Sequence, residues 1–103
     1  MLTRYDTEKS SYYDFCALLK AHLDEEVNVT TAVGRMDITD WRRVRRDYES
    51  SYVKICHPDG STETTVMNRW QPRSVTGRKV AQIYVIPQAT ECIDYKAEYA
   101  DRS

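Results

Sequence analysis

The chain has 103 residues, of which 41% are hydrophobic and 30% charged, and its formal net charge is −1. This length is typical of one domain, so we expect residues 1–103 to form a single globular domain. The supply of tyrosine, tryptophan, valine and isoleucine argues against global disorder. No apolar run approaches the ~18–20 residues that a membrane-spanning helix needs, which argues against a membrane protein.

Three cysteines, Cys16, Cys56 and Cys92, leave at least one thiol unpaired and match no disulfide framework. The N-terminal segment MLTRYDTEKSSYYDF lacks the apolar stretch of a signal peptide. We therefore predict a cytoplasmic protein, either in its own cell or in a host cell.

The first predicted element is a helix in SSYYDFCALLKAHLDEE. Apolar residues recur there every three or four positions, which is one face of a helix. They are Tyr12, Phe15, Cys16, Leu19 and Leu23, with His22 beside them. Ser11, or Thr7 one turn earlier, is a suitable N-cap. The acidic run at residues 24–26 opposes the helix dipole and predicts the end of the helix.

Four strands are predicted after this helix, at residues 27–33, 51–57, 62–69 and 79–86. In the first, VNVTTAVG, β-branched residues dominate and alternate. Pro58-Asp59-Gly60 favours a turn between the second and third strands. The nearly continuous apolar run in the fourth predicts a central strand covered on both faces. Residues 90–103 either form a short helix or are frayed.

A second short helix is predicted around DWRRVRRDY, over residues 38–49. In helical geometry the apolar residues of this segment form one stripe, whereas in a strand neither face would be apolar. The stripe contains Ile38, Trp41, Val44 and Tyr48. Asp37 is a suitable N-cap.

The predicted fold class is α+β: an N-terminal helix packed on a roughly four-stranded antiparallel sheet, with the second helix between the first two strands. A β-rich meander without that helix is the alternative, because SSYVKI could extend backward through the arginine block.

Charge is distributed unevenly along the chain. Residues 1–34 carry three basic and six acidic groups, residues 35–79 ten and six, and residues 80–103 two and four. The middle is therefore basic and both ends are acidic, which hints at an anionic partner unless folding brings the ends beside the middle.

Helical spacing sorts the four arginines of the block. Arg43 and Arg45 each have an acidic residue three or four positions away and can form local ion pairs. Arg42 and Arg46 lie one turn apart, and we expect no local carboxylate to pair with them, so they are the first candidates for contact with a partner. A solvated, self-paired helix face is the alternative interpretation.

More basic residues follow around the second tryptophan. The full set of candidate binding residues is Arg42, Arg46, Arg69, Trp70, Arg73, Arg78 and Lys79. Arginine beside an exposed aromatic ring can bind phosphate and stack on bases, and the same pair dominates protein–protein hot spots. Trp70 is equally compatible with a place in the core.

The sequence contains no recognisable catalytic or metal-binding motif. Neither His22 nor His57 has cysteine partners at zinc-site spacing. The chain also lacks a glycine-rich phosphate loop, a GxSxG elbow and paired catalytic carboxylates. We predict no catalytic residue, no metal site and no cofactor.

These observations favour a small non-enzymatic interaction protein that binds a macromolecular partner, such as an accessory protein or a virus-type inhibitor of a larger complex. The alternatives are a nucleic-acid-binding module, which a sequence pI near 6.1 disfavours, and a small nuclease with His57 as general base. The expected partner is a protein, with nucleic acid as the alternative and no membrane. A homodimer is a further alternative, because an uncovered sheet edge and many tyrosines favour self-association.

Overall fold

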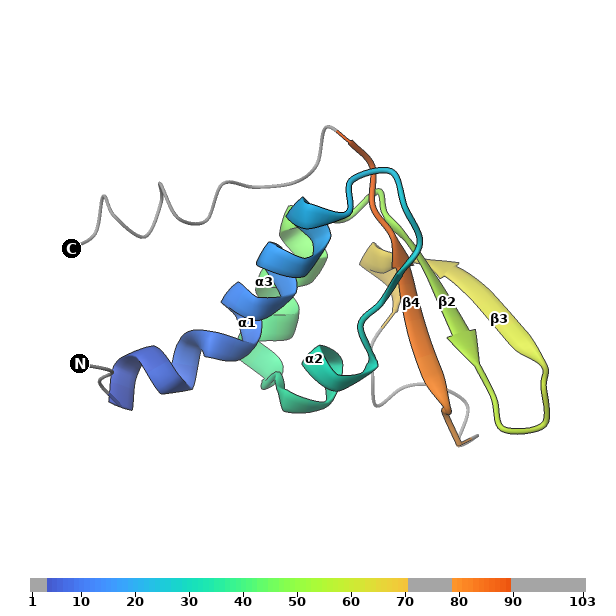
Figure 1. The fold of residues 1–103 in the computed structure, drawn as a ribbon, viewed down its shortest axis with the longest axis horizontal. Helices are drawn as coiled ribbons and strands as arrows, with labels where there is room; N and C mark the ends of the chain where they lie inside the picture. The colour runs from blue at the N-terminus through green and yellow to red at the C-terminus, as the bar shows by residue number, and fades with distance from the viewer. Residues whose placement is uncertain (1–3, 71–78, 90–103) are drawn as a thin grey trace.

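The structure, a computed structural model, describes residues 4–70 and 79–89. Helices accompany a four-stranded antiparallel sheet, so the predicted α+β class is confirmed. The elements are α1 (Arg4–Ala21), β1 (Val27–Asn28), α2 (Thr30–Arg35), α3 (Ile38–Asp47), β2 (Tyr52–Cys56), β3 (Thr62–Val66), the 3-10 turn η1 (Met67–Arg69) and β4 (Gln82–Ile86). The three α-helices lie on one side of the sheet (Figure 1).

Helix α1 is longer at its start and shorter at its end than predicted. It begins at Arg4, ahead of both candidate N-caps, because no glycine or proline interrupts this segment. The predicted buried face is correct for Tyr12, Phe15, Cys16 and Leu19. Past Ala21 the chain turns, with Asp24 at a positive φ of 68°. Leu23 is therefore 39% exposed and does not belong to the core.

The predicted strand at 27–33 is wrong beyond its first two residues, because α2 starts at Thr30. The Asn28 side chain explains the switch: its Oδ1 accepts hydrogen bonds from the backbone nitrogen of Thr30 at 3.1 Å and from its hydroxyl at 2.7 Å. Such local side-chain bonds compete with the sheet ladder. Ala32 and Val33 are neighbours and both are buried, which a helix packed between α1 and β4 permits.

The strand order in the sheet is β1-β4-β2-β3, and every pairing is antiparallel. The predicted strands at 51–57 and 79–86 are confirmed in shortened form, and β4 is internal, as expected. The prediction that β4 is covered on both faces is wrong for the described residues. Ile83 and Val85 are buried under the helices, whereas Tyr84 and Ile86 on the other face are only half-buried.

The predicted strand at 62–69 ends at Val66, where η1 begins. Residues three apart share one side of a 3-10 turn, and here that side carries Met67 and Trp70, both buried. Turning the chain inward brings both side chains to the core, which a continued edge strand would not do. The predicted turn before β3 is confirmed: the Gly60 nitrogen donates to the His57 carbonyl at 3.0 Å, and the φ of Gly60 is 92°.

None of the described helices is long and apolar enough to cross a membrane. The predicted helix or frayed tail at 90–103 lies outside the described residues.

Candidate functional site

Helix α3 confirms the second predicted helix, with its end at Asp47 instead of residue 49. The predicted N-cap is correct: the Asp37 carboxylate accepts a hydrogen bond from the Asp40 nitrogen at 2.8 Å. Trp41 and Val44 are buried, and so is Tyr48 just past the end of the helix. The helix is thereby held to the core along one face, which fixes the direction of its other side chains.

Two edge-to-face aromatic pairs hold this helix in place. The rings of Trp41 and Trp70 lie 4.8 Å apart at an interplanar angle of 88°. The rings of Phe15 and Tyr48 lie 5.8 Å apart at 66°. Trp70 is only 3% exposed, so its interpretation as a core residue is the correct one and its ring cannot stack on a base.

The outward side of α3 carries an exposed stripe that we call the α3 face, made of Ile38, Arg42 and Arg46. These residues lie four apart and therefore above one another along the helix. The prediction that Ile38 packs inward is wrong: it is 59% exposed, because it occupies the first turn, ahead of the turn in which Trp41 reaches the core. An apolar side chain thus lies in line with two guanidinium groups.

The arginines pair differently from the spacing-based prediction. The side chain of Arg46 is 75% exposed, and its Nε lies 3.3 Å from the Asp47 carboxylate, so the expectation that Arg46 lacks a local carboxylate is wrong. Such an exposed contact is weak. Arg42 makes no hydrogen bond or ion pair with any described residue. Arg43 lies over the Tyr12 ring, 4.8 Å from its centroid.

Arg69 and Lys79, the exposed members of the remaining candidate set that the structure describes, lie apart from one another. Arg69 is exposed in η1, next to α3 and the start of β2, since the Met67 nitrogen donates to the Ser51 carbonyl. Lys79 is exposed near His57, beyond the other end of β2. Five residues of strand separate the two ends, which is about 17 Å at ~3.3 Å per residue. Arg73 and Arg78 lie outside the described residues.

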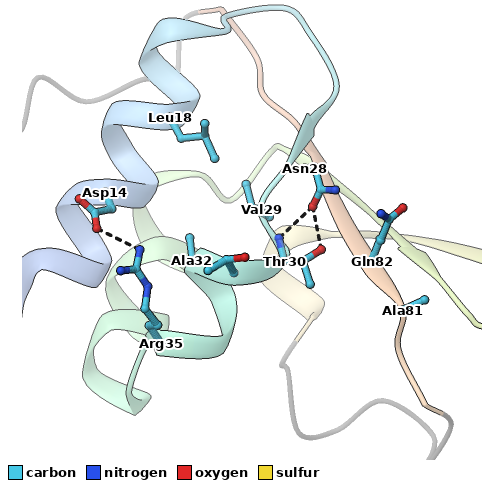
Figure 2. Close-up of a pocket in the computed structure, with 10 residues that line it drawn as sticks. Asp14, Leu18, Asn28, Val29, Thr30, Ala32, Arg35, Ala81 and Gln82 are labelled. Carbon is cyan, nitrogen blue, oxygen red and sulfur yellow. Dashed lines mark hydrogen bonds and ion pairs between the residues drawn. The ribbon is translucent and has the colours of Figure 1, made fainter.

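A groove of about 690 Å³ lies between α1, α2 and the start of β4. Its polar groups bind one another (Figure 2): Arg35 contacts Asp14 at 3.0 Å, and Asn28 accepts from Thr30. No local sequence pattern predicts this groove, because its lining comes from four separate elements. It is a weaker candidate than the α3 face, since these side chains already have partners within the chain.

His57 serves the fold. Its ring is 4% exposed, its Nδ1 lies 2.8 Å from the Lys79 carbonyl oxygen, and its Nε2 lies 2.5 Å from the Glu63 carboxylate. The ring therefore joins the end of β2 to β3 and to the segment before β4. Because both nitrogens face acceptors within the chain, neither is available to activate a substrate or bind a metal.

Replacing His57 with alanine is expected to destabilise the protein by about 1–3 kcal/mol, because it removes a buried imidazole and its hydrogen bond to the Lys79 carbonyl. Glu63 contributes less, since its side chain is 38% exposed and can bind water instead. Urea denaturation measures the loss. His22→Ala is the matched control and should change stability by less than about 0.5 kcal/mol, because His22 is exposed. Equal stability of the two variants would contradict this role for His57.

In the described ranges, no three histidine, cysteine or acidic side chains come together in a way that could hold a metal ion. Cys16 is buried and Cys56 half-buried, and neither is in a disulfide. The Lys54 ammonium on the outer face of the sheet contacts Glu26, which raises the lysine pKa, and it also lies 5.0 Å from the centre of the Tyr84 ring. This cation is therefore engaged within the chain.

Comparison of the chain with family models, with curated proteins and with solved structures finds no match in any of the three.

Proposed function

We propose that this protein is a non-enzymatic interaction protein that binds an acidic protein surface through the α3 face. The observation that carries the proposal is the exposed row of Ile38, Arg42 and Arg46 on a helix whose opposite side is anchored by buried aromatic rings. A helix fixed in this way loses little backbone conformational entropy on binding, because its backbone is already ordered. A partner of this kind is consistent with an accessory protein or inhibitor that covers part of a larger complex.

The composition of the row favours a protein over a nucleic acid as the partner. Arginine is enriched in protein–protein hot spots. An exposed isoleucine in line with two arginines adds apolar area that a phosphate backbone would not use. Nucleic-acid binding has less support, because Trp70 is buried and Lys79 lies far from Arg69.

The nuclease alternative, with His57 as general base, also has less support. Both nitrogens of the ring are engaged by Lys79 and Glu63, and the side chain is buried. We further propose a reducing compartment such as the cytoplasm, because the Cys56 thiol is unpaired.

Binding should depend on single side chains of the α3 face. Arg42→Glu is expected to weaken partner binding by about thirtyfold or more, which corresponds to the ~2 kcal/mol of a hot-spot residue. Ile38→Ser should weaken it as well. The readout is affinity capture from a lysate of the source cells, followed by titration of the captured protein against each purified variant.

Lys79→Glu is the matched control, because it makes the same charge change at the other end of the sheet. It should leave the affinity for a protein partner unchanged. All three side chains are exposed, so thermal unfolding should differ little among the variants. Equal binding by wild type, Ile38→Ser and Arg42→Glu would refute the proposal. If the protein instead binds nucleic acid, with an affinity that Ile38→Ser leaves unchanged and that falls steeply with salt, the nucleic-acid alternative is the correct one.

A further inference from the structure

A second surface, separate from the α3 face, is the outer edge of β3. This strand ends the sheet order, and no described strand pairs with its outer side (Figure 1). Unpaired edge strands are usually protected against pairing with another chain by a lysine, a proline or a β-bulge, or because the strand is very short. The strand TETTV has five residues and contains neither lysine nor proline. Its one charge, Glu63, is bound to His57.

The pairing of β2 with β3 fixes which backbone groups point outward. The His57 nitrogen donates to the Ser61 carbonyl and the Met67 nitrogen donates to the Ser51 carbonyl, so odd-numbered residues of β3 hydrogen-bond to β2. The backbone N–H and C=O groups of the even-numbered residues therefore point away from β2. These residues are Thr62, Thr64 and Val66.

We propose that β3 pairs antiparallel with β3 of a second copy of this chain, about a two-fold axis at Thr64. In this register Thr64 lies opposite Thr64 of the second copy, and Thr62 opposite Val66. The Thr64 pair uses outward-pointing groups and can exchange two hydrogen bonds. In each Thr62–Val66 pair the Val66 N–H can donate to the Thr62 carbonyl, while the Val66 carbonyl accepts the first hydrogen bond of η1. The two sheets then form one continuous sheet, which removes the exposed edge from both copies.

The charge and the length of β3 favour this register over its neighbours, and they favour a second copy of the strand as the partner. In it all five residues of the strand have partners, and Glu63 lies opposite Thr65 of the second copy. Moving the axis to Glu63 would place two carboxylates directly opposite one another, which is unfavourable. Moving it to Thr65 would pair Thr62 with a residue of η1. Threonine opposite threonine is a favourable cross-strand pair, so the strand is complementary to itself.

Charge substitutions at Thr64 test the axis directly. Thr64→Lys and Thr64→Glu should each raise the dimer dissociation constant by about tenfold or more, because each places like charges opposite one another. An equal mixture of the two variants should dimerise again, since the lysine then faces the glutamate. Sedimentation equilibrium measures the dimer dissociation constant of each variant alone and of their mixture. Ala17→Lys and Ala17→Glu, exposed on α1, are the matched controls and should dimerise like wild type.

Amide hydrogen exchange on the unaltered protein gives an independent measurement. The amides of Thr64 and Val66 should be protected at high protein concentration and exposed on dilution. The amides of Glu63 and Thr65 bond to β2 and should be protected at both concentrations. The inference is overturned if the wild type stays monomeric at high concentration, if both Thr64 variants dimerise like wild type, or if the mixture does not recover.

Discussion

Replacing Trp41 with alanine is expected to lower the free energy of unfolding by about 3–5 kcal/mol, the range for a buried aromatic residue in a core. Trp41 is 4% exposed and packs edge-to-face on Trp70, so its removal leaves a cavity between α3 and η1. Small domains have only about 5–15 kcal/mol of stability in total. Urea denaturation followed by circular dichroism should therefore show a much lower midpoint.

Ile38→Ala is the control for this prediction because it lies one turn away on the same helix and is 59% exposed. It should change stability by less than about 0.5 kcal/mol. A loss below about 1 kcal/mol for Trp41→Ala would show that the two tryptophans do not support α3. A large loss, by contrast, implies that the α3 face depends on a core residue that a partner does not touch.

Replacing Tyr12 with phenylalanine is expected to cost about 1.5–3 kcal/mol at neutral pH, the range for a hydrogen bond to a charged group. The hydroxyl of Tyr12 donates to the Asp47 carboxylate, and the ring is 2% exposed. This bond ties α1 to the end of α3. The measurement is again urea denaturation, with Tyr52→Phe, on the open face of the sheet, as a control of small effect.

The same bond gives stability a defined pH dependence. Burial, and then the hydrogen bond to Asp47, raises the pKa of Tyr12 far above the usual value for tyrosine. Above about pH 10 the Tyr12 hydroxyl loses its proton in the unfolded chain but keeps it in the native chain. The contribution of this hydroxyl to the free energy of unfolding is therefore fully present below about pH 10 and falls above it. The stability difference between wild type and Tyr12→Phe should therefore shrink above about pH 10, by at most ~1.4 kcal/mol per pH unit. A constant difference would contradict the assignment.

The sequence was most informative where one pattern had a single solution. The stripe of Trp41, Val44 and Tyr48 and the cap at Asp37 predict α3 correctly, because neither face of a strand would have been apolar. The strand predicted after Val27 was wrong, because the local hydrogen bonds of Asn28 to Thr30 outweigh the strand preference of the alternating β-branched residues. Strand propensity depends on tertiary surroundings, and here the surroundings favour a helix beneath α1.

The candidate site was less predictable than the fold. Arg42 and Arg46 could be selected because helical spacing is local, but the exposure of Ile38 depends on where the core ends. Whether Arg69 and Lys79 lie together depends on the path of the chain between two strands, which no local pattern encodes. Trp70 is buried because the 3-10 turn directs it inward, and the sequence of this turn contains no pattern that predicts it.

The strand order has a consequence for how the chain must assemble. Because β4 is the last of the described strands in sequence but lies between β1 and β2, a nascent chain that ends before Gln82 cannot join β1 to the β2–β3 hairpin. The facing sides of β1 and β2 stay open until synthesis delivers β4. Sheet completion is therefore a late, long-range event during translation, and such events are slow and leave intermediates prone to aggregation.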